Sequence, residues 1–185
     1  LVVDTRGGSV VHTDLLAYPS VAPTHKQPAP PPVALLNDSD TRYFVAQNGL
    51  VSSNGAQDQP NHLALFHSDK AAYERASGQD ELQVPLTWQN ADGLKVTKIY
   101  TFKRGSYVIG LTQRIDNGST QTWQGNAYRQ LLRVEPPKPS GWLKSLMDPE
   151  SRSFQGAAWY TGEKFEKLPF QNFTEKDDAL DASYK

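Results

Sequence analysis

The 185-residue sequence contains no cysteine, which excludes disulfide bonds, cysteine metal sites and thiol nucleophiles together. No stretch approaches the roughly 20 consecutive apolar residues that a membrane-spanning helix needs, and no signal peptide pattern opens the chain. An excess of one charge is also missing, because 19 basic residues balance 20 acidic ones. Without a positive field to hold a phosphate backbone, nucleic-acid binding is not expected.

Length and composition bound the organisation of the chain. A hydrophobic content of 37% and a charged content of 21% suit one globular domain with a real core, so a single domain over residues 1–185 is expected. The chain starts inside an apolar run at residues 1–3 and ends at Lys185 without a recognisable stop. These ends suggest a portion of a larger protein.

Residues that could carry catalysis do not fall into a known pattern. The histidines do not match a zinc-protease spacing, and the serines lack a nucleophile-elbow context. Gly7 and Gly8 are not followed by a helix pattern that would complete a phosphate cradle. We therefore expect no catalytic residue, no metal site and no cofactor.

Alternation of apolar and polar residues is the dominant pattern, and it predicts strands. It is clearest in three successive segments, residues 81–89, 94–103 and 107–117. Turn chemistry at residues 90–93 and 104–106 joins them, which predicts a three-stranded antiparallel meander. Lys98 and Ile99 interrupt the alternation of the middle segment.

Further strand patterns set the fold class. They cover residues 9–16, 42–48, 62–66, 123–134 and 156–160. Many short strands joined by polar, glycine-containing turns favour a β-sandwich over a parallel α/β sheet, which would need helices between its strands. The predicted class is all-β and mainly antiparallel, with short helical pieces.

Two segments fall outside the strand pattern. Residues 19–34 are rich in proline, which favours extended polyproline conformation and cannot sustain a ladder of hydrogen bonds. A surface loop that acts as a rigid connector is favoured over a proline-rich docking ligand, because no aromatic or arginine flank completes a docking motif.

The second such segment is residues 135–153, a variable loop with room for one short helix that Ser140 would cap. An apolar turn in this helix would consist of Trp142, Leu143, Leu146 and Met147. If exposed, this turn could touch a lipid surface or a partner, but packing on the sandwich is the favoured interpretation.

Several short motifs occur in a fixed order along nearly the whole chain. They read DTRGG at 4–8, LLAYP at 15–19, QDELQVP at 79–85, FKRG at 102–105, FQGAA at 154–158 and EKFEK at 163–167. In this order and spacing, the chain closely resembles the large periplasmic domain of the YidC family of bacterial membrane protein insertases, in its Gram-negative form. Residues 19–32 and 135–153 depart from the family pattern.

The resemblance implies a twisted β-supersandwich similar to galactose-mutarotase-like and sugar-binding domains, located in the periplasm as part of an inner-membrane protein. It implies a non-catalytic role in an insertase and chaperone that assists the insertion, folding and assembly of inner-membrane proteins. Implied partners are the accessory translocase subunits SecD and SecF, the Sec translocon and nascent inner-membrane proteins. Contact with the membrane is expected only through transmembrane segments that this chain does not contain.

Within the family, the region resembling residues 154–185 is associated with SecD and SecF. The candidate partner-binding residues are Phe154, Trp159, Tyr160, Glu163, Lys164, Phe165, Glu166, Lys167 and Phe170. Aromatic anchors with a charged rim are typical of protein interfaces. The competing interpretation is that the aromatics pack into the core while the charges are solvated.

Two other functions stay open at this point. A carbohydrate or small-ligand module is suggested by Trp88, Trp123 and Tyr128, since aromatic faces stack on sugars, although core packing is the favoured explanation for them. A holdase-like surface for emerging membrane proteins is suggested by the apolar turn that starts at Trp142.

Overall fold

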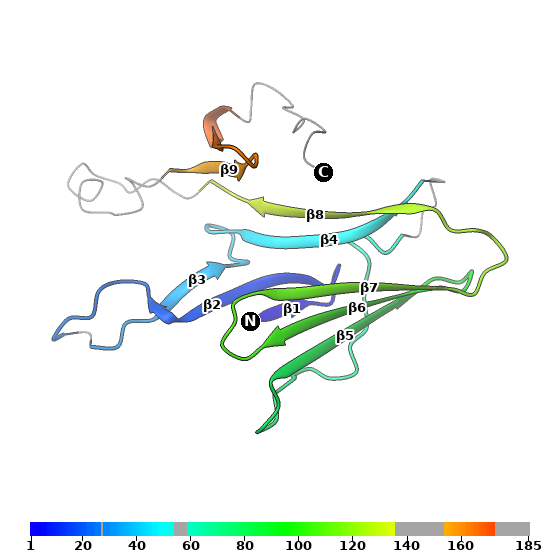
Figure 1. Ribbon diagram of the computed structural model, residues 1–185, viewed down its shortest axis with the longest axis horizontal. Coiled ribbons are helices and arrows are strands. Elements are labelled where there is room, and N and C mark those ends of the chain that lie inside the picture. Colours follow the sequence, from blue (N-terminus) through cyan, green and yellow to red (C-terminus); the bar gives the residue numbers. More distant parts are fainter. Residues whose placement is uncertain (27, 54–58, 136–153, 173–185) are drawn as a thin grey trace. The chain divides into compact units, whose positions relative to one another are not determined.

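The computed structural model describes residues 1–26, 28–53, 59–135 and 154–172. The chain forms two compact units, Leu1–Arg133 and Val134–Lys185. Almost all regular structure in both units is antiparallel β-sheet, as the sequence predicted (Figure 1).

The first unit contains a five-stranded sheet. Its strands run in the order β1-β2-β4-β8, with β3 paired to the far part of β2. The bounds are Val2–Asp4 for β1, Ser9–Pro19 for β2, Pro32–Leu36 for β3, Phe44–Ser52 for β4 and Gly125–Arg133 for β8. The β4–β8 ladder is the longest pairing in this sheet, running without a break from Phe44 opposite Arg133 to Ser52 opposite Gly125.

The second sheet of this unit is the predicted meander. It consists of β5 (Glu81–Gln89), β6 (Leu94–Lys103) and β7 (Ile109–Asn117) in sequential order. The β5–β6 turn is tight because Gly93 adopts a φ of 93° and the Asn90 carboxamide accepts a hydrogen bond from the Leu94 N–H at 2.9 Å.

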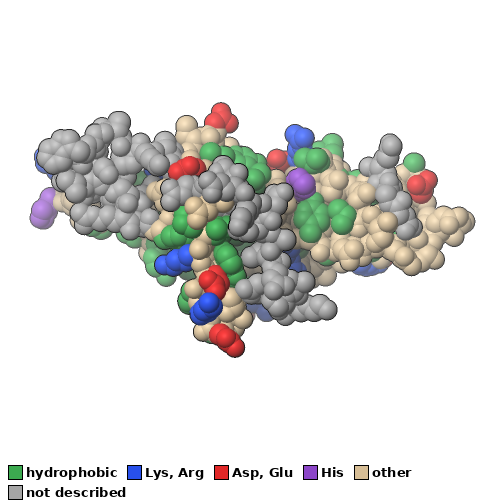
Figure 2. Space-filling model, turned by 90° about the horizontal axis from the view of Figure 1, so that it is seen from above, with side chains coloured by type: hydrophobic (Ala, Val, Ile, Leu, Met, Phe, Trp, Pro, Cys, Tyr) green, Lys and Arg blue, Asp and Glu red, His purple; other side chains and the backbone are tan. Residues whose placement is uncertain are grey.

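The core of the first unit lies between its two sheets. Its buried hydrophobic side chains are Val10, Leu36, Leu50, Phe66, Leu86, Trp88, Leu94, Val96 and Tyr100. β6 contributes Leu94, Val96 and Tyr100 from the same face, so this face of the central strand is buried. On the face shown in Figure 2, charged side chains of both signs are interspersed with groups of apolar side chains.

The second unit is built on a β-hairpin. β9 (Gly156–Tyr160) pairs with β10 (Phe165–Pro169), so that Tyr160 lies opposite Phe165 and Trp159 opposite Glu166. A 3-10 turn, η2 (Phe170–Asn172), follows directly. The turn of the hairpin closes through the Thr161 N–H, which donates to the Lys164 carbonyl at 2.9 Å.

Several element boundaries differ from the sequence predictions. The strand predicted at residues 62–66 is wrong, because the Asn61 side chain and carbonyl accept hydrogen bonds from the N–H groups of Leu63 and Ala64 and fold the chain into a turn. The proline-rich connection is shorter than predicted, since β2 continues to Pro19 and β3 begins at Pro32. The helix predicted within residues 135–153 lies outside the described residues.

Candidate functional site

A buried polar cluster joins the two sheets of the first unit. Lys98 is fully buried on the inner face of β6, so the alternation that seemed interrupted at this position in fact continues. Its ammonium group donates hydrogen bonds to the Gly7 carbonyl at 2.6 Å and to the Asn48 carbonyl of β4 at 2.9 Å. The same nitrogen lies 4.5 Å from the centroid of the Phe66 ring.

Tyr100 completes this inter-sheet cluster. Its hydroxyl donates to the Gly8 carbonyl and accepts a hydrogen bond from the Asn48 carboxamide nitrogen at 2.9 Å. The Asn48 side-chain oxygen is buried and has no hydrogen-bond partner among the described residues. Lys98 and Tyr100 thus connect β6 to β4 and to the glycine pair that precedes β2.

The glycine pair is shaped for this contact. Gly7 and Gly8 have φ values of 74° and 55°, a left-handed conformation that disfavours side chains. A Cβ on Gly7 would lie 2.3 Å from the His62 carbonyl oxygen, whereas one on Gly8 would lie 3.2 Å from the Lys98 side chain. The motif at residues 4–8 is therefore explained by backbone geometry and close packing.

Burial changes the acid–base chemistry of the cluster. The pKa of Lys98 falls from 10.5 to about 7, because desolvation penalises its charged form. The pKa of Tyr100 is raised, mainly by burial, while the hydrogen bond from Asn48 acts in the opposite direction. Since the side chains of Lys98 and Tyr100 are buried, these pKa shifts affect the stability of the fold.

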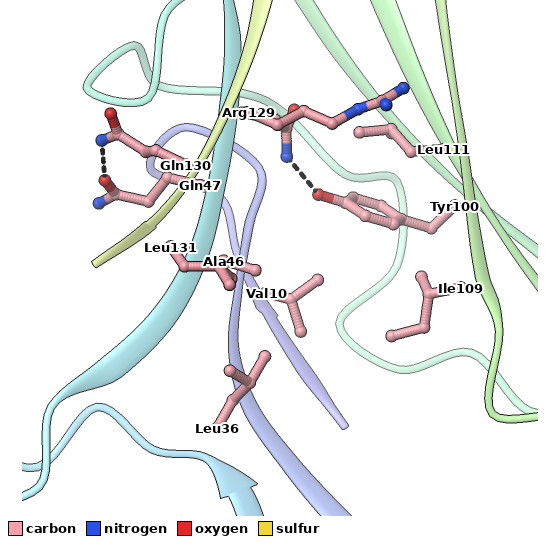
Figure 3. A pocket seen from close by; sticks show the side chains of 11 residues that line it. Val10, Leu36, Ala46, Gln47, Tyr100, Ile109, Leu111, Arg129, Gln130 and Leu131 are labelled. Carbon is pink, nitrogen blue, oxygen red and sulfur yellow. Dashed lines mark hydrogen bonds between the residues drawn. The ribbon is translucent and has the colours of Figure 1, made fainter. Parts of the chain in front are cut away.

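A cavity of about 470 Å³ opens beside this cluster, between β4 and β8 on one side and β7 on the other (Figure 3). Its apolar lining consists of Val10, Leu36, Ala46, Ile109, Leu111 and Leu131. The Arg129 side chain extends from β8 across the cavity toward Leu111, and its guanidinium makes no hydrogen bond or ion pair with any residue that the structure places. The cavity thus combines apolar walls with the guanidinium of Arg129.

The three aromatic residues suggested for sugar stacking do not share this cavity. Trp88 is buried in the core, and the Tyr128 hydroxyl is bonded to the backbone and ring nitrogens of His62 at 2.8 and 2.6 Å. Trp123 lines a different cavity at the opposite end of β8. No stacking platform forms from them.

The β9–β10 hairpin separates the candidate partner-binding residues onto two faces. Tyr160 and Phe165 lie on one face, 55% and 74% exposed, with their ring centroids 5.0 Å apart. Lys167 lies on the same face, and its ammonium group lies 5.2 Å from the centroid of the Phe154 ring. Trp159 and Glu166 are half-buried on the opposite face.

The other candidates fall at the ends of the hairpin. Lys164 forms an ion pair with Glu166 at 2.8 Å, and Glu163 is exposed in the turn beside it. Phe170 is half-buried in η2. Trp142, Leu143, Leu146 and Met147 lie outside the described residues, so the apolar turn predicted there remains a prediction.

Comparison with known proteins gives the family. The model of the YidC periplasmic domain matches residues 1–184. The chain belongs to the YidC periplasmic domain family. It is 37% identical over 179 residues to the membrane protein insertase YidC of Thioalkalivibrio sulfidiphilus, covering 94% of this chain and 30% of the relative.

Other YidC relatives agree. The insertase of Methylococcus capsulatus is 39% identical over 173 residues, which cover 93% of this chain and 30% of the relative. That of Nitrosospira multiformis is 38% identical over 183 residues, covering 98% and 29%. The chain thus spans about 30% of the length of the curated relatives it matches.

Family membership places this domain in the periplasm, and the curated relatives that it matches are membrane protein insertases. None of the helical turns in the described residues has the length and apolar content needed to cross a membrane. Within the same residues, no three His, Asp or Glu side chains are grouped so that they could hold a metal ion. Lys98 and Arg129 were not among the residues predicted from the sequence. The only sequence signal for Lys98 was its position within an apolar face of β6.

Proposed function

We propose that this chain is a non-catalytic docking module of the insertase and that the exposed face of the β9–β10 hairpin contacts SecD and SecF. The observation that carries the proposal is the Tyr160–Phe165 ring pair, which leaves two large aromatic side chains mostly in water. Burial of such aromatics against a partner supplies much of the energy in protein interfaces.

The charges around the ring pair support a protein partner. Lys167 on the same face and Glu163 in the turn place both signs beside the aromatic pair. A mixed polar rim around an aromatic centre gives orientation and specificity to an interface. SecD and SecF are proposed as the partners because the family resemblance associates this region with them.

In-cell photo-crosslinking of the full-length insertase tests this proposal. A photoreactive probe at Phe165 is expected to give adducts with SecD or SecF. A probe at Leu65, which is 75% exposed against 74% for Phe165, serves as the control and is expected to give none. Equal yields from both positions, or no adduct from Phe165, would contradict the proposal.

Replacing Tyr160 and Phe165 together with serine is expected to weaken binding to purified SecD and SecF by roughly tenfold or more. Because both rings are exposed, the free energy of unfolding should change little. Leu65→Ser is the matched control for loss of exposed apolar surface. Affinity and thermal unfolding measured on the same samples separate lost contact from lost structure.

A second candidate function is binding of a small amphiphilic ligand in the 470 Å³ cavity. Its apolar walls suit an acyl chain, and the free Arg129 guanidinium suits a carboxylate or another anionic group. Calorimetry is expected to show decanoate binding more tightly than decanol, and Arg129→Gln should reduce the affinity for decanoate alone by roughly tenfold. Equal affinity for decanoate and decanol would show that Arg129 does not contribute to binding.

A further inference from the structure

We propose that a tyrosine-centred surface at one end of the first unit rests on the headgroup layer of an anionic bilayer. This surface, which we call the tyrosine patch, consists of Leu16, Tyr18, Tyr107 and Val108. It shares no residue with the 470 Å³ cavity, whose lining on β7 begins at Ile109, or with the β9–β10 hairpin.

The patch is assembled from two segments far apart in sequence. Tyr18 lies near the end of β2 and Tyr107 in the β6–β7 turn, yet their ring centroids are 5.8 Å apart. Both elements project at the same end of the first unit (Figure 1). Leu16, two positions before Tyr18, and Val108, next to Tyr107, are further exposed apolar residues of the same two segments.

The four side chains are mostly in water. Leu16 and Val108 are 84% and 75% exposed, and Tyr18 and Tyr107 are 55% and 58% exposed. Isolated exposed apolar residues are ordinary, but an exposed ring pair with further exposed apolar residues on the same two segments indicates a binding surface. Tyrosine pairs an apolar ring with a polar hydroxyl, and this combination favours the membrane–water interface.

The charge of the two segments decides which partner fits. Residues 16–31 and 103–108 contain His25, Lys26, Lys103 and Arg104 and no aspartate or glutamate. Arg104 forms an exposed ion pair with Asp80 at 3.6 Å, and Lys103 lies opposite Glu81 in the β5–β6 ladder. Of these basic residues, Lys26 is the one farthest in sequence from any aspartate or glutamate.

A lysine near exposed apolar side chains is attracted to anionic lipid headgroups. A projecting tip also suits a lipid surface better than a peptide, which would bind in a groove or along a free strand edge. This inference departs from the expectation that only transmembrane segments contact the membrane, because the sequence does not reveal that Tyr18 and Tyr107 meet. It does not depend on docking to SecD or SecF.

Vesicle co-sedimentation of this chain tests the inference. The chain is expected to bind vesicles of phosphatidylethanolamine and phosphatidylglycerol more tightly than phosphatidylcholine vesicles, and added salt should weaken the binding. Replacing Tyr18, Tyr107 and Val108 together with serine should reduce the bound fraction by roughly tenfold.

The control variant replaces Leu63 and Leu65, which are 58% and 75% exposed elsewhere on the same unit, with serine. It should bind vesicles as the parent chain does, and unchanged thermal unfolding of both variants would show that they fold. Equal binding by the patch variant and the parent, or no binding to anionic vesicles, would overturn the proposal. So would a photoreactive probe at Tyr107 of the full-length insertase that forms adducts only with proteins.

Discussion

Replacing Gly7 with alanine is expected to lower the free energy of unfolding by at least about 3 kcal/mol. A side chain at this position meets two penalties at once. The φ of 74° costs an L-residue about 1–2 kcal/mol, and the new Cβ would lie 2.3 Å from the His62 carbonyl oxygen. Since that neighbour is backbone, relief would require movement of residues 61–64, where the Ala64 carbonyl accepts the Gly7 N–H at 2.7 Å.

Gly8→Ala is the matched control for this prediction. Its φ of 55° imposes a similar conformational cost, but the nearest atoms to the new Cβ would be side-chain atoms, of Lys98 at 3.2 Å and Leu86 at 3.9 Å, rather than backbone. Urea denaturation should therefore show a loss of about 1–2 kcal/mol for Gly8→Ala and clearly more for Gly7→Ala. Equal losses would mean that contact with His62 contributes nothing.

Lys98→Met is expected to change how stability depends on pH. The folded pKa of Lys98 is about 7 and the ordinary value is 10.5, so between these values the unfolded chain binds a proton that the folded chain has released. Stability of the parent chain should then rise with pH across this range. The methionine variant lacks this titration, so the advantage of the parent should grow by roughly 2–4 kcal/mol from pH 7 to pH 10.

The sign of this effect distinguishes Lys98 from its neighbour. The raised pKa of Tyr100 acts in the opposite direction, because above pH 10.0 the unfolded chain loses the tyrosine proton first. Both chains keep Tyr100, so its contribution cancels in the difference between them. A difference in the free energy of unfolding that stays constant from pH 7 to pH 10, measured by urea denaturation, would show that Lys98 is not desolvated in the folded state.

Much of the fold could be predicted where local signals are strong. The β5–β6–β7 meander follows from alternation and from the turns at residues 90–93 and 104–106, which act over short distances. β1 and β3 were not among the predicted strands, and β3 begins at Pro32 inside the proline-rich segment. Their pairing with β2 is a tertiary effect, and at residues 62–66 the apolar pattern predicted a strand where Asn61 imposes a turn.

The candidate site was predictable only in part. Tyr160 and Phe165 could be named from composition and family resemblance, but their separation from Trp159 required the register of the hairpin. Lys98 interrupted an apolar face, and a sequence cannot tell whether such a lysine ends a strand or is buried with carbonyl partners. The cavity depends on β4, β7 and β8 together, and Arg129 carries no local signal that marks it.

The strand order of the first unit affects the order in which it can fold. β8 completes the five-stranded sheet by pairing with β4, although the whole of the three-stranded sheet lies between them in the chain. Synthesis proceeds from the N-terminus, so the edge of β4 that pairs with β8 stays without that partner until residue 133 has been made. Such distant pairing slows folding and leaves an open strand edge that can join another chain. A chaperone that shields this edge during export would act on β4.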